Sequence, residues 1–310
     1  MSTRPTILAM QPLLKRLVGA LEADYRVLRY WDAPAPADLA ETRVMVVIGE
    51  APLDKALIER LPNLGLVASV NAGYDGLDLP WLRARGLATT HAWDVNQEDV
   101  ADHTIGAIVA IVRQLIAGDR TVREGRWSAQ GKVFPPSLAG KRVGIVGLGG
   151  IGVAVARRCE VMRMPVAWWG PREKPGAAWP RAADLETLAR DSDILVVACR
   201  AEESNRGLIS RQVVEALGPD GLLVNVARGQ VVDEDAVIAA LKDGRLGAAA
   251  LDVFVTEPTP PERWADVPNT LLTPHTAGAT TAAAAAMMVQ LKANLAAFFA
   301  GEPLKTPIKE

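Results

Sequence analysis

Three side chains in the second half of the chain have the chemistry that carbonyl reduction requires, and each follows an apolar run. Arg228 follows LLVNVA, Glu257 lies in LDVFVTEP and His275 lies in LLTPHTAGAT. A guanidinium can hold a carboxylate in a bidentate grip, and an imidazole gives or takes a proton near neutral pH. Reduction of a 2-oxo acid needs both of these functions.

Glu257 completes the set, because a carboxylate on the second ring nitrogen would orient His275 and favour its protonated form. The predicted roles are substrate binding for Arg228, proton transfer for His275 and support of the imidazole for Glu257. Taken singly, an arginine after a strand is most often a surface residue, and a lone histidine is most often structural. The prediction therefore rests on the occurrence of all three behind a glycine-rich loop. His91 and His103 are interpreted as structural residues.

The glycine-rich loop lies in VGIVGLGGIG at 143–152 and has the spacing G-x-G-x-x-G. It follows a short apolar run and precedes a stretch of helical period. One glycine permits a tight turn, the next lets backbone N–H groups approach a pyrophosphate, and the third lets the helix pack on the sheet. In this context the loop predicts a dinucleotide site rather than an ordinary turn. Its predicted cofactor-binding residues are Gly147, Leu148, Gly149, Gly150, Ile151 and Gly152.

The segment after the next apolar run, PVAWW, bears on the form of the dinucleotide. An NAD site has an acidic side chain at about this place, which binds the ribose hydroxyls. Here the run is followed by GPREK, in which Arg172 and Lys174 suit the 2′-phosphate of NADP. NADP is therefore the predicted cofactor. NAD is the alternative, because Glu173 would reach the hydroxyls if the loop turned one residue differently.

Two sets of alternating apolar runs and helical stretches must position these residues. From Thr6 to about Thr90, the runs TILAM, VMVVIG and LVASV alternate with segments such as 53–61. From Lys141 onward, KRVGIVG, PVAWW, DILVVAC, GLLVNVA and GAAALDV are apolar on both faces, which indicates parallel strands between two layers of helices. The predicted fold is α/β, with two Rossmann-like doubly wound parallel-sheet domains. The catalytic residues would then lie off the carboxyl ends of the strands.

Two long helical segments divide the chain. The segment 96–115 is expected to form a bridging helix. The Ala-rich segment 281–299 is expected to form a helix that ends at Gly301 and returns the chain to the first domain. The predicted substrate domain is discontinuous and comprises residues 1–98 and 285–310. The predicted dinucleotide domain comprises residues 99–284.

The composition limits the classes of partner. The 310 residues include 34 basic and 36 acidic side chains, a net charge of −2, so neither nucleic acid nor a membrane is an expected partner. No signal peptide is expected, and no apolar run is expected to reach the ~20 residues of a membrane span. Cys159 and Cys199 lie in apolar runs and predict free thiols in a reducing compartment, so a cytoplasmic location is expected. No metal site is predicted.

With its motifs in this order, the sequence resembles the D-isomer-specific 2-hydroxyacid dehydrogenase family along nearly the whole chain. The glycine loop and the ARG, EP and PH stretches all match. The resemblance implies an NAD(P)-dependent oxidoreductase that acts on a 2-oxo or 2-hydroxy acid, with Arg228, Glu257 and His275 in the roles given above. It also implies a homodimer built by the coenzyme domains, for which the bridging helix and the extension near Trp127 are the expected contacts.

The resemblance implies further contacts with the substrate and the cofactor. The loop 71–75 resembles one whose backbone amides, near Ala72 and Gly73, receive the substrate carboxylate; a plain turn is the alternative. Asp252 would face the nicotinamide carboxamide, and Thr104 would touch the cofactor. The other cofactor residues that the resemblance implies are Cys199, Ala227 and Gly278.

One departure from the family pattern lies beside the adenosine. Cys199-Arg200 stands where the family commonly has a Thr-Pro step, so the path of this loop is expected to differ. Arg200 is more often explained as a solvated surface charge.

Within the family, the sequence most resembles the glyoxylate and hydroxypyruvate reductases, through PHTAGAT and Arg263-Trp264. The predicted reaction is reduction of a small 2-oxo acid to the D-2-hydroxy acid. Lactate, phenylpyruvate and phosphoglycerate-type substrates stay open, because pocket residues of the first domain decide the side chain accepted. A dinucleotide-sensing corepressor on the same fold is an alternative from another class. The chain has no long disordered segment of the recruiting kind, which counts against that alternative.

Overall fold

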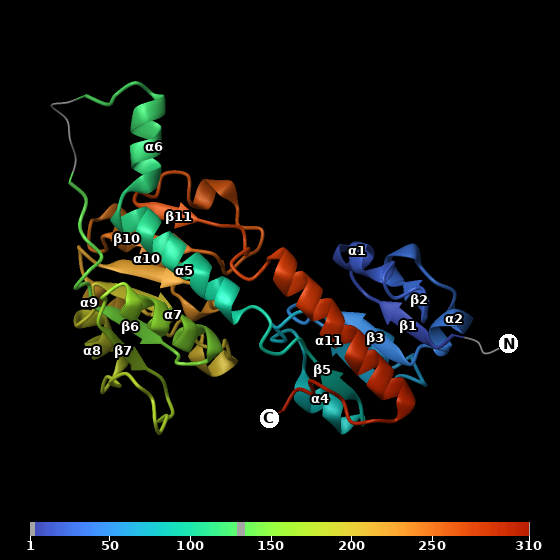
Figure 1. Cartoon of the computed structure of the whole chain (residues 1–310). Coiled ribbons are helices and arrows are strands. Elements are labelled where there is room, and N and C mark those ends of the chain that lie inside the picture. Colours follow the sequence, from blue (N-terminus) through green and yellow to red (C-terminus); the bar gives the residue numbers. More distant parts are fainter. Residues whose placement is uncertain (1–3, 129–133, 310) are drawn as a thin grey trace. The chain divides into compact units, whose positions relative to one another are not determined.

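The computed structural model describes residues 4–128 and 134–309 and divides into two compact units (Figure 1). Unit 1 comprises Met1–Val95 and Thr281–Glu310, and unit 2 comprises Asn96–Thr280. The units change at the beginnings of two helices, and so the boundaries lie at 95/96 and 280/281 rather than at 98/99 and 284/285.

Unit 1 is built on a five-stranded parallel sheet with the order β2-β1-β3-β4-β5. The strands are β1 (Thr6–Ala9), β2 (Arg26–Arg29), β3 (Val44–Val47), β4 (Leu66–Ser69) and β5 (Ala88–Thr90). Both faces of the sheet are covered, which explains why its central strands are buried at every position. One face packs against α1 (Lys15–Val18) and α11 (Thr281–Ala300). The other packs against α2 (Pro36–Ala40), α3 (Lys55–Ile58) and α4 (Leu79–Ala84).

Helix α11 is long and apolar enough to meet the length and composition of a membrane span, which corrects the expectation that no segment would reach that length. The bent pair of helices at 97–112 and 115–123 meets the same criteria when it is counted as one span. In unit 1, Leu291 and Leu295 of α11 pack in one core with Ile7 and Val46 of the sheet. Burial in this core accounts for the apolar side chains on one face of α11, where 28% of its most apolar stretch is buried.

Unit 2 is built on a six-stranded parallel sheet with the order β11-β10-β9-β8-β6-β7. The strands are β6 (Val143–Val146), β7 (Val166–Trp169), β8 (Ile194–Val197), β9 (Leu222–Asn225), β10 (Ala248–Leu251) and β11 (Thr270–Leu272). The helices are α5 (Gln97–Val112), α6 (Leu115–Arg123), α7 (Gly150–Val161), α8 (Leu185–Arg190), α9 (Arg211–Leu217) and α10 (Glu234–Lys242).

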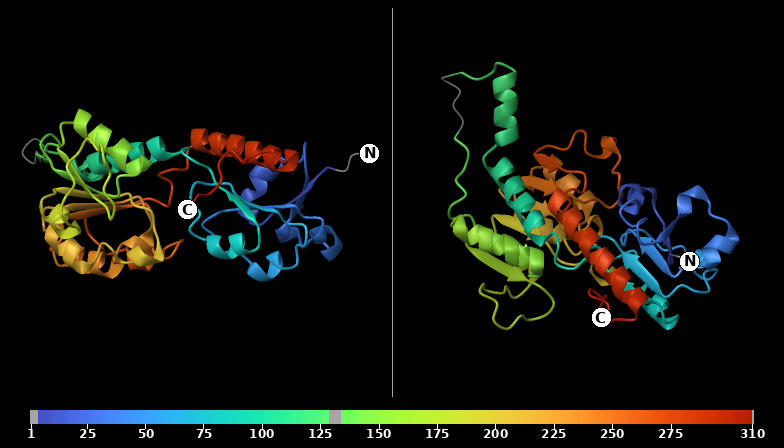
Figure 2. Two further views of the ribbon diagram at one scale, coloured as in Figure 1. Left: turned by 90° about the horizontal axis from the view of Figure 1, so that it is seen from below. Right: turned by 45° about the vertical axis from the view of Figure 1, so that its right-hand side comes forward.

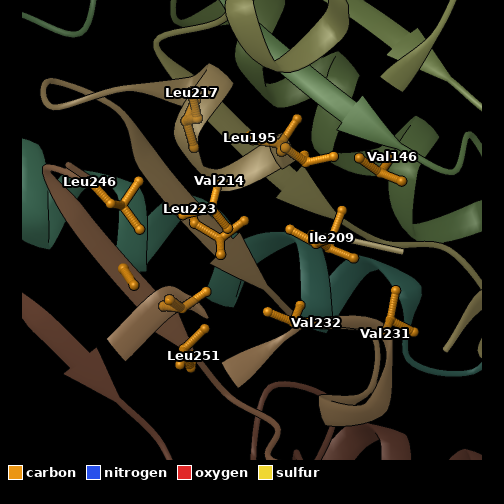
Figure 3. Close-up of a cluster of buried hydrophobic side chains, with 14 of the residues drawn as sticks. Val146, Leu195, Ile209, Val214, Leu217, Leu223, Val231, Val232, Leu246 and Leu251 are labelled. Atoms are coloured by element: carbon orange, nitrogen blue, oxygen red, sulfur yellow. The ribbon is translucent and has the colours of Figure 1, made fainter. Parts of the chain in front are cut away.

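The sheet of unit 2 has a hydrophobic core on each face, because successive side chains of a strand point to opposite sides. Ile145 lies in the core beneath α5 and α7, and Val146 lies in the core beneath α8, α9 and α10. Figure 3 shows the second of these cores, where Leu195, Leu223 and Leu251 come from three neighbouring strands. Figure 2 shows that the sheet of each unit lies between two layers of helices.

The predicted fold class, two Rossmann-like parallel-sheet domains, is confirmed. The charged strand β2 was missing from the predicted runs, because a strand at the edge of a sheet need not be apolar on both faces. The same holds for the three-residue strand β5. Helix α3 spans four residues instead of the nine of segment 53–61. Helix α5, expected to bridge the domains, lies within unit 2 and packs on α7.

Candidate active site

The glycine loop connects β6 to α7 at the point in unit 2 where the strand order reverses. Ligands of open parallel sheets bind outside the carboxyl ends of the strands at such a point. Strand β6 lies between β7 and β8. The chain therefore runs from β6 to β7 on one side and then crosses to β8 on the other side. The position of the loop therefore matches that of a dinucleotide site.

Each glycine of the motif meets a different structural demand. Gly147 has φ +94°, and a side chain there would come within 2.5 Å of the Cα atom of Cys199. A side chain at Gly152 would overlap the carbonyl oxygen of Gly147, so this glycine lets α7 pack against the turn. Gly149 has open space where its side chain would be, and it is the N-cap of α7. The residues present thus fit a pyrophosphate at the helix N-terminus, where first-turn N–H groups lack helical partners.

The segment after β7 carries cations close to this loop. The ammonium of Lys174 donates a hydrogen bond to the carbonyl of Leu148 within the glycine loop. Arg172 and Glu173 are both exposed. Arg181, which sequence reasoning missed, donates to the carbonyl of Gly170 at 2.7 Å. Lys174 and Arg181 therefore place positive charge beside the glycine loop and the end of β7.

Arg228 follows β9, and a buried asparagine shapes the turn that carries it. Asn225 accepts the N–H of Ala227 at 3.1 Å and donates to the carbonyl of Arg228 at 3.0 Å. The guanidinium of Arg228 donates to the carbonyl of Ala227 at 2.8 Å, and the residue is half-buried. Asn225 is therefore a structural support of Arg228 that sequence reasoning did not single out, although it begins the NVARG stretch.

The turn after β9 packs on the turn after β10. A side chain at Gly229 would overlap the backbone of Phe254 and Val255, so a glycine is required at this contact. The N–H of Phe254 in turn donates to Oε1 of Glu257 at 2.9 Å. The backbone that carries Arg228 is thereby tied to the loop that carries Glu257.

Of the three predicted catalytic side chains, His275 and Glu257 contact each other directly. Nδ1 of His275 lies 2.7 Å from Oε2 of Glu257. His275 has φ +53°, a left-handed conformation that is uncommon outside glycine and is adopted more often by His, Asn and Asp than by other residues. Both side chains are about one-third exposed, so the pair lies at the surface of unit 2.

Asp252 holds the loop that carries His275 in this conformation. Its carboxylate is 2% exposed and accepts the N–H groups of Thr276 and Ala277, each at 2.9 Å. It also accepts the hydroxyl of Thr273 at 2.6 Å, and its backbone carbonyl accepts the N–H of His275 at 2.8 Å. These bonds make Asp252 a clamp for residues 273–277. Its predicted contact with the nicotinamide carboxamide stays a prediction.

Two residues at the N-terminal half of α5 contact this segment of the chain, His103 within the helix and Asn96 at its N-cap. Nε2 of His103 lies 3.1 Å from the hydroxyl of Thr273, so this histidine is a neighbour of the clamp. A side chain at Gly278 would overlap the side-chain amide of Asn96. Thr104 is fully buried and donates its hydroxyl to Val100 within the helix. A contact between Thr104 and the cofactor stays a prediction.

Hydrogen bonds to two side-chain oxygens and a close contact at a glycine determine the conformation of the loop 71–75 of unit 1. The hydroxyl of Ser69 donates to the carbonyls of Asn71 and Gly73 at 3.0 and 3.3 Å. Oδ1 of Asn71 accepts the N–H of Gly49 at 2.9 Å. A side chain at Gly49 would overlap the carbonyl of Gly73. These contacts attach the loop that contains Ala72 to the end of the sheet, and its predicted role in binding the substrate carboxylate stays a prediction.

The two cysteines are free, as the sequence predicts. Burial raises the pKa of the Cys159 thiol to about 12 and that of the Cys199 thiol to about 11. Cys199 is half-buried, lies against Gly147, and stays protonated near neutral pH. Over residues 4–128 and 134–309, no group of three or more His, Cys, Asp or Glu side chains could hold a metal ion.

Comparison with protein families matches residues 105–277 to the model of the D-isomer specific 2-hydroxyacid dehydrogenase, NAD binding domain. Among proteins of described function, the chain is 41% identical to glyoxylate/hydroxypyruvate reductase A of Arabidopsis thaliana, over 97% of this chain and 98% of that protein. It is 33% identical to 2-ketogluconate reductase of Gluconobacter oxydans, over 99% and 100% of the two chains.

Solved structures lead to the same family. The 2-hydroxyacid dehydrogenase of Ketogulonicigenium vulgare is 40% identical, with a TM-score of 0.93 and 99% of both chains covered. The NADPH-dependent glyoxylate/hydroxypyruvate reductase of Sinorhizobium meliloti, in complex with NADP and malonate, is 34% identical, with a TM-score of 0.90 and 99% and 97% covered. These matches span both units and confirm the resemblance seen in the motifs. The chain belongs to the D-isomer specific 2-hydroxyacid dehydrogenase family.

Proposed function

We propose that this enzyme reduces small 2-oxo acids of the glyoxylate and hydroxypyruvate type to D-2-hydroxy acids, with NADPH as reductant. The observation that carries the proposal is the pair of His275 and Glu257, 2.7 Å apart at the carboxyl end of the sheet, with the loop of His275 held by Asp252. The relatives from Arabidopsis thaliana and Sinorhizobium meliloti carry the names of such reductases and support this substrate class.

In the proposed mechanism His275 is the proton donor. Nδ1 faces the carboxylate of Glu257, so the other ring nitrogen is left to protonate the carbonyl oxygen of the substrate. Glu257 stabilises the imidazolium and fixes the ring, since its second oxygen is held by the N–H of Phe254. Bound NADPH supplies the hydride. Arg228 binds the substrate and stabilises the negative charge that develops on its oxygen.

The loop of Ala72 and Gly73 is the proposed site for the substrate carboxylate. In the described part of the chain, neither residue donates its N–H to a hydrogen bond, although the carbonyls on both sides of Ala72 are bonded. Two successive N–H groups in a turn form a concave site for an anion.

NADPH is proposed over NADH because of the cations that follow β7. Lys174 reaches the glycine loop, and Arg172 is exposed two residues before it. A 2′-phosphate carries two negative charges and accepts strong hydrogen bonds from such groups. The Sinorhizobium meliloti relative is described as NADPH-dependent, which supports this choice. The remaining predicted cofactor residues, Ala227, Cys199 and Gly278, are proposed to line the dinucleotide.

The test is oxidation of NADPH and of NADH at 340 nm with a panel of 2-oxo acids. We expect the highest kcat/KM with glyoxylate or hydroxypyruvate and NADPH, and lower values with pyruvate, phenylpyruvate and 2-ketogluconate. Chiral analysis of the product of hydroxypyruvate should give the D isomer. A protein that binds NADPH but reduces none of these acids would instead be a dinucleotide sensor.

We further propose a homodimer formed through unit 2. Helix α6 projects away from the sheet of unit 2 (Figure 1). It has no buried residue, and its Leu115, Ile116 and Val122 are exposed. Beyond it, Trp127 is 74% and Phe134 is 82% exposed. Such a group of exposed apolar side chains is typical of an interface. Light scattering should give twice the chain mass of 33.1 kDa, and the double variant Trp127→Ser, Phe134→Ser should lower that value.

The cytoplasm is the proposed location, without nucleic acid or a membrane as partner. Its support is the two free thiols, which suit a reducing compartment, and the net charge of −2. Cell fractionation with an antibody to the native protein tests this location, and recovery in the membrane fraction would contradict it.

A further inference from the structure

His91 is a buried histidine in unit 1 that the proposed mechanism does not use. It follows β5, is 7% exposed, and its Nδ1 lies 2.9 Å from the carbonyl oxygen of Ala72. A carbonyl oxygen is an acceptor, so Nδ1 must carry the proton in this contact. The interpretation of His91 as an ordinary structural residue leaves out this contact with the loop that is proposed to bind the substrate carboxylate.

The position of the imidazole is set by its surroundings. The ring makes edge contacts with Tyr74 and Trp93, whose ring centres lie 4.7 and 5.7 Å away. The backbone of His91 is bonded on both sides to Thr306, whose hydroxyl donates to its carbonyl and whose carbonyl accepts its N–H at 3.3 Å. Thr306 is held in turn by the buried side chain of Asn294 at 2.8 Å. These contacts hold the imidazole of His91 in place, and its hydrogen bond to Ala72 attaches the loop 71–75 to it.

Because a peptide bond is planar, a hydrogen bond to its carbonyl also fixes the direction of its N–H group. In a trans peptide the C=O and N–H bonds point in opposite directions. The carbonyl of Asn71 is held by the N–H of Ala92 at 3.1 Å and by Ser69, which turns the N–H of Ala72 away from them. The carbonyl of Ala72 is held by His91, which turns the N–H of Gly73 away from the imidazole.

We propose that His91 is a positioning residue for the substrate carboxylate and acts through the peptide between Ala72 and Gly73. It makes no contact with the substrate. Its hydrogen bond keeps the Gly73 N–H aligned with that of Ala72, so that both donate to one anion. This inference rests on the proposed function, because the anion is taken to be the carboxylate of a 2-oxo acid.

The test compares His91→Phe with His91→Asn. Phe keeps an aromatic ring against Tyr74 and Trp93 but cannot donate, whereas Nδ2 of Asn has the same place along the side chain as Nδ1 of His. We expect KM for glyoxylate to rise roughly fivefold to tenfold in the Phe variant, as for the loss of one hydrogen bond to an anion site. In this variant kcat and the Kd for NADPH should stay within about twofold of the unmodified enzyme. The Asn variant should recover most of the loss in KM.

A binding measurement separates this inference from the proposed function. Oxamate has the carboxylate and carbonyl of a 2-oxo acid, and its Kd with NADPH present is measured by calorimetry without turnover. It should rise by the same factor as KM in His91→Phe and recover in His91→Asn. An unmodified protein that binds oxamate but reduces no acid would contradict the proposed function, while the comparison of Kd values would still decide the role of His91.

Equal KM and Kd values in the Phe variant and the unmodified enzyme would overturn the inference. A rise in KM that is accompanied by a fall in kcat and in NADPH affinity would also overturn it, because that pattern indicates a general loss of structure. If His91→Phe does not fold, His91→Leu and His91→Asn provide the comparison, since the two side chains have similar shapes and Asn alone of the pair donates. Equal oxamate affinity in that pair would contradict the proposed role.

Discussion

Nδ1 of His275 lies 2.7 Å from Oε2 of Glu257, and Oε1 of the same carboxylate accepts the N–H of Phe254 at 2.9 Å. Both oxygens of Glu257 are therefore engaged, one by the imidazole and one by the backbone. The carboxylate cannot rotate without breaking one of these bonds. This arrangement fixes which ring nitrogen of His275 faces Glu257 and which is left for proton transfer.

Substitution of the pair should affect the chemical step more than binding. We expect His275→Ala to lower kcat by about a hundredfold or more, the range typical of a lost general acid. Glu257→Gln keeps the shape of the side chain but removes its charge, and should lower kcat with little change in KM. Steady-state kinetics at saturating NADPH give both values. Near-normal turnover of His275→Ala at every pH would show that another group donates the proton.

Arg228 should be required for the substrate and not for the dinucleotide. Arg228→Ala removes the charged donors proposed to bind the 2-oxo acid, each worth about 1.5–3 kcal/mol, so kcat/KM should fall by about a hundredfold or more. Arg228→Lys keeps the charge without the planar fork and should recover little of the loss. Fluorescence titration with NADPH should give an unchanged Kd for both variants. A parallel loss of NADPH affinity would place Arg228 at the cofactor instead.

The two glycines at the start of α7 allow a matched comparison. Gly152→Ala puts a methyl group into the carbonyl of Gly147 and should lower the thermal stability of the protein. Gly149→Ala meets no atom within 4 Å, so its Tm should stay close to that of the unmodified protein. The methyl group would nevertheless occupy the space assigned to the pyrophosphate, and Kd for NADPH should rise about tenfold or more. Normal NADPH binding by Gly149→Ala would contradict the assignment of this loop.

Removal of the cations after β7 should weaken NADPH more than NADH. Arg172→Ala should raise KM for NADPH about tenfold, as for the loss of ~1.5–3 kcal/mol of charged hydrogen bonding, and change that for NADH little. Lys174→Ala should act in the same direction. Glu173→Gln is the control, because it should leave the preference for NADPH intact. Equal kcat/KM for the two cofactors in the unmodified enzyme would end this proposal.

Burial of the thiols should lower the free energy of unfolding at high pH. Burial raises the pKa of Cys159 from 9.0 to about 12, so between these values the unfolded chain loses a proton that the folded chain keeps. The free energy of unfolding should then fall by up to about 1.4 kcal/mol per pH unit across this window. Below pH 9 this thiol should contribute no pH dependence. Urea unfolding at pH 8 and pH 10 measures the difference, and Cys159→Ala should show a smaller one.

The sequence predicts the two parallel sheets well because their central strands are buried on both faces and are largely apolar. The same reasoning overlooks β2, whose sequence RVLR reads as a charged surface segment. Motif order identifies Arg228, Glu257 and His275 because each carries chemistry at a strand end. The contact between Glu257 and His275 required the structure, since 18 residues separate them in the chain.

Residues that act through backbone groups are harder to find. Asn225 and His91 each bind a backbone carbonyl of a functional loop, and nothing in the type or spacing of such residues indicates a partner 3 or 19 positions away. Lys174 was predicted from its charge, but its bond to the carbonyl of Leu148 follows from the turn of the loop after β7. Sequence patterns indicate which side chains can do chemistry, and the structure adds the supports that hold them.

The return of α11 to unit 1 sets an order of events during synthesis on the ribosome. Leu291 and Leu295 belong to the same core as Ile7 and Val44, at the opposite end of the chain. At roughly 5–20 residues per second, translation of the intervening unit takes on the order of 10 to 40 seconds. Through that interval α1 packs on this face of the first sheet, but the apolar area that α11 covers stays exposed. The unit made first is therefore the last to complete its core, and the nascent chain is exposed to aggregation and to chaperone binding until its final helix has emerged.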